Sequence, residues 1–275
     1  MTISVEEWSG KDRKDENFPV GSALIAAHLR PHVHAFYAFA RNADDIADSS
    51  TLDLADKLAR LDVMEAVLLG HGDASPSAIK LRHSLAATGV TARHAQDLLI
   101  AFRRDAVQPR TPDLADLFHY CRHSAAPVGR HVLALHGESE ATWPASDSLC
   151  AALQINNHLQ DCARDLETMD RCYLPDTILA KYGSNINDLR RPTATPALRA
   201  VLDALLDECD RLNREGAQLP TLVRNRRLRA ETAVIVKLAQ RLSTRLRRAD
   251  PLAARVKLSK GDAALSVLGS LWRLL

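Results

Sequence analysis

Two acidic segments with helical spacing stand far apart in this chain. The first, RNADDIAD, holds Asp44, Asp45 and Asp48, and the second, QINNHLQDCARD, holds Asp161 and Asp165. Residues four apart lie on one face of an α-helix with Cβ atoms roughly 5–6 Å apart, so each segment can present two carboxylates to one point. Mg²⁺ prefers oxygen ligands and usually bridges one or two carboxylates to substrate phosphates. Together the segments predict a site for divalent metal and phosphate.

Amides extend the second acidic segment. Two amides and two carboxylates share one stripe with apolar flanks, at steps of three, four and four residues: Gln154, Asn157, Asp161 and Asp165. A solvated face more often carries Lys or Arg four residues after an acid, although Arg164 leaves a salt-bridged surface open as an alternative. In the first segment, Arg41 can pair with Asp44 or Asp45, or it can give a diphosphate a bidentate cationic contact.

Metal ions between two such segments would stabilise negative charge that grows on a departing diphosphate. The other product is a carbocation, which requires an apolar pocket closed to stray water. Aromatic rings can face a cation across such a pocket. The candidates are Phe36, Tyr37, Phe39 and Tyr120, and each is also a candidate for plain core packing.

Composition bounds the class of protein. With 275 residues, 46% of them apolar, and a formal charge of +2, the chain predicts a folded globular protein without a footprint for nucleic acid. The five cysteines lack C-x-x-C spacing and no secretory signal is visible, so we expect reduced thiols and a cytoplasmic protein. No apolar run is long enough to span a membrane. Peripheral contact stays open, because residues 261–275 place Leu265, Leu268, Leu271 and Leu275 at helical spacing beside Trp272.

The acidic segments must be positioned by helices, because helix signals dominate and alternating strand patterns are almost absent. We predict one all-α domain over residues 1–275, with residues 1–15 as a loose segment and a long loop to Pro196. The expected helices are Pro31 to Asp48, 52–69, Pro76 through Leu85, one capped by Thr91, one from Thr111 through Val128, 146–167, 197–214, 229–248 and a terminal one.

Three motifs connect these residues to a known family. FYAFARNADDIAD, YCRHSAAPVG and LQINNHLQDCARD followed by RCYLP, in this order, resemble the squalene and phytoene synthase family of head-to-head prenyl synthases over roughly residues 16–250. The resemblance implies an isoprenoid synthase helical bundle with a central cavity between two Asp-rich helices, two or three Mg²⁺ ions and a prenyl diphosphate substrate. It assigns metal ligands to Asp44, Asp45, Asp48, Asp161 and Asp165, and diphosphate or metal support to Gln154, Asn157, Arg41 and Tyr37. It places Tyr120 close to the reacting carbons and Tyr173 in the segment after the second motif.

Departures from the family pattern point to one branch. Gln160 stands where many condensing members have the Arg of N-x-x-R-D, and ENFPVGS (Glu16 to Ser22) replaces an S-K-S-F type opening. Both features are similar to the hydroxysqualene synthase branch of bacterial hopanoid pathways. Such enzymes ionise presqualene diphosphate, rearrange the cation and quench it with water. No G-x-G-x-x-G follows a strand, so no NADPH is expected. Asp170 stands where the family usually has Gly, with an effect that the sequence leaves open.

Other functions remain as alternatives. A condensing synthase would join two prenyl diphosphates into presqualene diphosphate, squalene or a phytoene-type product. A non-catalytic lipid-binding or assembly protein on this scaffold would not need the intact acidic pairs. A metal hydrolase using His119 and His123 lacks the Glu of H-E-x-x-H. Transfer of a hydrophobic substrate or product to neighbouring pathway enzymes is compatible with any synthase of this kind.

Overall fold

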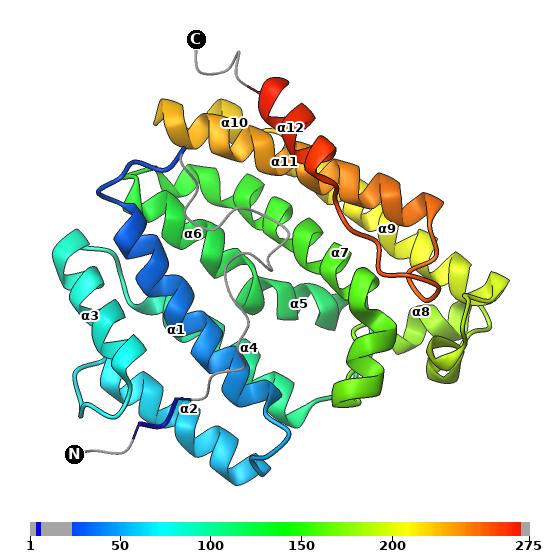
Figure 1. Ribbon diagram of the computed structural model, residues 1–275, viewed down its shortest axis with the longest axis horizontal. Coiled ribbons are helices and arrows are strands. Elements are labelled where there is room, and N and C mark those ends of the chain that lie inside the picture. Colours follow the sequence, from blue (N-terminus) through cyan, green and yellow to red (C-terminus); the bar gives the residue numbers. More distant parts are fainter. Residues whose placement is uncertain (1–3, 7–23, 271–275) are drawn as a thin grey trace.

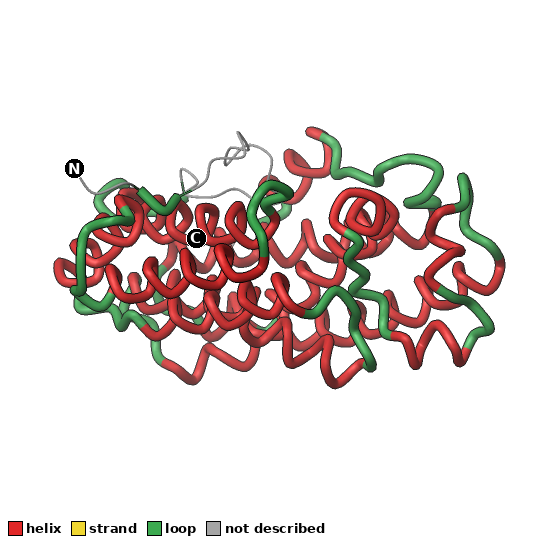
Figure 2. Tube along the Cα trace, turned by 90° about the horizontal axis from the view of Figure 1, so that it is seen from below, coloured by secondary structure: helices red, strands yellow, loops and turns green. Residues whose placement is uncertain are grey.

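The computed structural model describes residues 4–6 and 24–270. Over these residues the chain forms helices and loops without a β-strand, apart from one isolated bridge between Arg110 and Cys172 (Figures 1 and 2). The all-α prediction is therefore confirmed. No helix in this part of the chain is both long and apolar enough to cross a membrane.

The helices follow the chain in this order: α1 Arg30–Asp48, α2 Leu54–Leu68, α3 Pro76–Thr88, α4 Arg93–Val107, α5 Leu114–Ser124, α6 Ala126–Leu135, η2 Glu140–Thr142, α7 Trp143–Met169, α8 Asp176–Lys181, η3 Ile186–Arg190, α9 Pro196–Gly216, α10 Leu219–Leu222, α11 Arg226–Arg248 and α12 Lys260–Leu268. Several starts follow local chemistry. The side chains of Asp53, Ser75 and Asp113 each accept a hydrogen bond from the backbone amide three residues on, which satisfies an otherwise orphaned helix donor.

Separate apolar cores hold the two acidic helices. α1 packs with α2, α3 and α4 around buried side chains such as Phe39, Ile46 and Met64. The longest helix, α7, packs with α5, α9 and α11 around a second core that includes Ile155 and Leu159. The apolar flanks of each acidic stripe therefore anchor its helix and leave the acids on the remaining face.

The structure corrects several predicted boundaries. The helix expected from Thr111 through Val128 is two helices, because Ala125 leaves helical geometry and Pro127 in the first turn of α6 has no amide hydrogen to continue α5. The long loop before Pro196 contains α8 and η3, and the short α10 was not predicted. The N-cap position of α4 is Ala92, not Thr91. The Thr91 hydroxyl instead accepts a hydrogen bond from the backbone amide of Arg93.

Both ends of the chain are described only in part. Residues 4–6, within the segment expected to be loose, lie against the α2–α3 connection, where the Val5 amide donates to the Ala74 carbonyl. The Glu6 carboxylate accepts from the Ser75 hydroxyl and the Ser77 amide. The ENFPVGS segment lies outside the described residues. So do Leu271, Trp272 and Leu275 of the expected terminal helix, of which α12 is the described portion.

Candidate functional site

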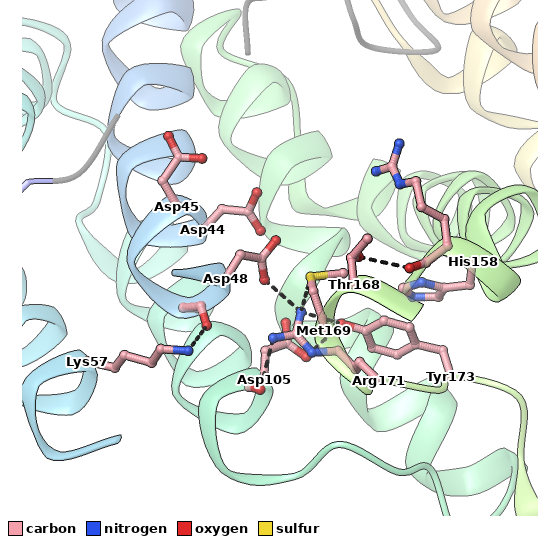
Figure 3. A network of polar contacts seen from close by, with 12 residues as sticks. Asp44, Asp45, Asp48, Lys57, Asp105, His158, Thr168, Met169, Arg171 and Tyr173 are labelled. Atoms are coloured by element: carbon pink, nitrogen blue, oxygen red, sulfur yellow. Dashed lines mark hydrogen bonds and ion pairs between the residues drawn. The ribbon is translucent and has the colours of Figure 1, made fainter. Parts of the chain in front are cut away.

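The three aspartates of the first segment occupy the last turns of α1. Asp44 and Asp48 extend from α1 in the same direction (Figure 3), and Asp44 lines a cavity. Asp45 is only 5% exposed and is held by Arg41, whose Nη2 lies 2.7 Å from Asp45 Oδ1. Nη1 of the same Arg41 lies 3.1 Å from Asp44 Oδ2. The local ion pair that the sequence left as an alternative is therefore present, within the predicted site.

The second acidic pair occupies the C-terminal half of α7. Nη2 of Arg255 donates to Asp161 Oδ2 at 2.8 Å, and its Nε lies 2.8 Å from Oδ1. Burial, together with the charges of Asp161 and, across the site, Asp48, raises the pKa of Asp165 to about 7. Asp44 of α1 and Asn157, one helical turn before Asp161 on α7, line the same cavity, so the acidic faces of the two helices border one space.

The carboxylates fit Mg²⁺ in chemistry and number. Among the described residues, no three His, Cys, Asp or Glu side chains converge on one point to form a complete protein cage. Mg²⁺ seldom needs such a cage, because one or two carboxylates, waters and substrate phosphates usually complete its coordination. A buried carboxylate with a raised pKa beside other acids also favours a cation. Asp44, Asp48, Asp161 and Asp165 are the residues that could hold it.

A buried network next to the acids was not predicted (Figure 3). Asp105 of α4 accepts hydrogen bonds from the hydroxyls of Tyr120, at 2.7 Å, and Tyr173, at 2.8 Å. Arg171 donates from Nη1 to Asp48 at 2.7 Å and from Nη2 to the Asp105 backbone carbonyl at 3.0 Å. Burial raises the pKa of Asp105 to about 6, although Arg171 and the two hydroxyls oppose that rise. The network links α1, α4, α5 and the segment after α7.

The rings of the two tyrosines are also fixed. His158 stacks on Tyr173 with ring centroids 3.7 Å apart, and the Arg104 guanidinium lies 4.8 Å from the centre of the Tyr120 ring. Burial, with Arg104 and Arg171, lowers the pKa of His158 to about 3, so this imidazole is neutral. Asp105 and His158 carried no sequence signal, since a lone acid in RRDAV or a His on an apolar flank is common. Arg171 could have been noted from its place in RCYLP.

A cavity of about 300 Å³ is lined by Asp44 and by other residues of α1 and α7. One group of lining residues is polar: Tyr37, Arg41, Asp44, Gln154 and Asn157. Beyond them the wall is mainly apolar, with Val33 and Phe36 from α1 and Leu149 and Leu153 from α7. The central cavity predicted between the Asp-rich helices is present. Phe39, considered as a lining residue, is instead fully buried in the α1 core.

The departures from the family pattern have structural counterparts. Gln160 is buried and its amide donates to the Val256 carbonyl, so it anchors the segment that brings Arg255 to Asp161. Asp170 ends α7 in the left-handed region, with φ of 51°, where Gly is usual because it has no Cβ. Nη2 of Arg110 lies 2.9 Å from the Asp170 carboxylate.

His119 and His123 contact each other on α5, with ring centroids 4.7 Å apart. They join no cluster of three metal-ligating side chains in the part of the chain that the structure describes. The hydrolase alternative gains no support from this geometry.

Comparison with known proteins places the chain. A model of the squalene/phytoene synthase family matches residues 11–262. The hydroxysqualene synthase of Rhodopseudomonas palustris is 45% identical over 271 residues, which cover 98% of this chain and 93% of that protein. The hydroxysqualene synthase of Sinorhizobium fredii is 43% identical over 271 residues, which again cover 98% of this chain and 93% of that protein. The crystal structure of squalene synthase HpnC from Alicyclobacillus acidocaldarius aligns with a TM-score of 0.76 at 32% identity, covering 86% of this chain and 90% of that one. The chain therefore belongs to the squalene/phytoene synthase family.

Proposed function

We propose that this protein is a hydroxysqualene synthase that ionises presqualene diphosphate, rearranges the resulting cation and captures it with water. The observation that carries the proposal is the cavity whose wall combines Asp44, Arg41 and the amides of Gln154 and Asn157 with a larger apolar surface. Such a shape matches a substrate with an anionic head and a long hydrocarbon body. The names of relatives at 43–45% identity support this branch over others of the family.

The polar end of the cavity supplies the contacts for the leaving group. Arg41 has a guanidinium at the cavity wall, and the amides of Gln154 and Asn157 face the same space from α7. Bound Mg²⁺ would supply Lewis-acid stabilisation of the departing diphosphate. The residues that would hold it are Asp44, Asp48, Asp161 and Asp165. Asp45 supports the site indirectly, because its carboxylate fixes Arg41.

The bond changes balance without a reductant. The C–O bond to the diphosphate breaks, and its electron pair leaves with the diphosphate oxygen. The carbocation that remains rearranges inside the apolar part of the cavity, whose wall excludes bulk water. A single positioned water then forms the new C–O bond and loses a proton. Tyr120 is held by Asp105 next to this space, and its ring can face the cation.

The test uses purified protein with Mg²⁺ and without NADPH, given presqualene diphosphate or, separately, farnesyl diphosphate, with products identified by mass spectrometry. Hydroxysqualene from presqualene diphosphate, and no consumption of farnesyl diphosphate, is the expected result. Consumption of farnesyl diphosphate would move the protein to the condensing branch. No reaction with either substrate would refute the proposal and favour a binding role.

A further inference from the structure

An imidazole without a hydrogen-bond partner lies in the cavity wall. His131 of α6 is fully buried, and neither of its ring nitrogens has a hydrogen-bond partner among the described residues. Nearly all buried polar side-chain atoms in proteins are hydrogen-bonded, so each exception needs an explanation. The ring is part of the cavity wall.

Packing fixes the orientation of this ring. His131 stacks on Phe36 with centroids 3.9 Å apart and planes 12° apart, and His94 meets it edge-on at 6.4 Å. Burial, with His94 and His32, lowers the pKa of His131 to about 3, so the ring is neutral and one of its nitrogens is an acceptor. A neutral, immobilised imidazole can orient a water and take a proton from it.

The ring also lies at a suitable depth. Phe36 is eight residues before Asp44 on α1, a distance of roughly 12 Å along the helix axis at 1.5 Å per residue. A prenyl substrate with its diphosphate at the acids would therefore have its hydrocarbon near His131. The Ser124 hydroxyl, one helical turn from Tyr120, is a second buried wall atom without a partner. Thr232 and Glu231, which also line the cavity, have other polar or electrostatic contacts.

We propose that His131 holds the water that quenches the carbocation and accepts its proton. This inference rests on the proposed function. The water oxygen forms a bond to the cationic carbon, one water O–H bond breaks, and the proton passes to the acceptor nitrogen of His131. The imidazolium then returns the proton to solvent or to released diphosphate. Even a weakly basic imidazole is a far stronger base than an alcohol oxygen, so proton transfer to it from the protonated alcohol is downhill.

The test compares His131→Phe and His131→Gln with the wild-type protein, using presqualene diphosphate, Mg²⁺ and ¹⁸O-labelled water. Phe keeps the stacking on Phe36 and removes both nitrogens, whereas Gln keeps hydrogen-bonding groups without the basic nitrogen. His94→Phe is the matched control, because it removes a buried imidazole from the same cluster that does not line the cavity. Diphosphate release and the fraction of hydroxysqualene among the products are measured separately.

In wild type we expect ¹⁸O in the hydroxyl group. His131→Phe should keep diphosphate release within about threefold but lower the hydroxysqualene fraction at least about tenfold in favour of hydrocarbons formed by proton loss, since a positioned base commonly contributes 10²–10⁴-fold. His131→Gln should give an intermediate fraction, and His94→Phe the wild-type one. Unchanged products in both His131 variants would overturn the inference and leave the proposed function intact, whereas an unlabelled hydroxyl would refute water capture and with it both proposals. A wild-type protein that does not consume presqualene diphosphate would refute both.

Discussion

Replacing Arg171 with Met should expose how the buried network stabilises the site. The Arg171 side chain is 8% exposed and pairs with Asp48, which is 23% exposed. It also lies close enough to lower the pKa of buried Asp105. Met preserves much of the side-chain volume but leaves the Asp105 carboxylate without its nearest cation. A charge buried in this way destabilises the fold unless it takes up a proton.

Removal of one partner from a buried pair costs about 3–5 kcal/mol. Asp48 retains contact with water, so we expect the lower end, about 3 kcal/mol at pH 8. For a chain of 275 residues, the unfolding entropy of about 2.1 cal/mol/K per residue converts this loss into a fall in Tm of about 5 °C. At pH 5.5 the fall should be smaller, because without Arg171 the pKa of Asp105 rises further and the carboxyl is protonated.

The assay is thermal unfolding followed by circular dichroism at both pH values. Asp105→Asn in the Arg171→Met background should recover at least about 1 kcal/mol relative to the sum of the single changes, as coupled neighbours do. Arg247→Met is the control, since Arg247 pairs with exposed Asp207 and an exposed pair is worth about 0–1 kcal/mol. A loss below about 1 kcal/mol for Arg171→Met, or strict additivity with Asp105→Asn, would refute the reasoning.

Further predictions concern metal, pH and the cavity. Asp48→Asn and Asp161→Asn should each lower turnover with presqualene diphosphate by at least about 10²-fold, the scale of one lost transition-state contact, and full activity in both would contradict the site assignment. Mg²⁺ with inorganic diphosphate should raise the Tm of wild type and raise it less in these variants, because ligands stabilise only the state that binds them. The Asp105 pKa is raised from 3.8 to about 6, so its contribution to stability is full below pH 4 and is lost as the pH rises to about 6. That loss, on the order of 3 kcal/mol, should be absent from Asp105→Asn in a pH series of denaturant titrations. His131→Phe should unfold at a higher Tm than wild type, since it removes two unsatisfied polar atoms while keeping the ring on Phe36, and a lower Tm would show that the imidazole is satisfied in solution.

Local sequence patterns predicted most of the helices and part of the candidate site. The 3.6-residue period placed α1, α7, α9 and α11 to within a few residues, because each buries one apolar stripe against a neighbour. The break at Ala125 was missed although Pro127 is visible in the sequence. A proline inside a helical pattern can mark either a bend in one helix or the first turn of a new one, and here it lies in the first turn of α6. Asp105 and His158 were missed because no local rule separates a buried polar residue from a solvated one.

The sequence by itself determined which residues share a helix face, since that depends only on spacing along one helix. It thereby placed Asp44 with Asp48, and Asp161 with Asp165, and the order of the motifs identified the family. Only the tertiary structure decided which faces meet. Packing brought Arg171 to Asp48 across 123 positions in the chain and Arg255 to Asp161 across 94, and it buried His131 in the cavity wall. Such contacts depend on how the apolar stripes of several helices fit together, and no single segment of the chain contains that information.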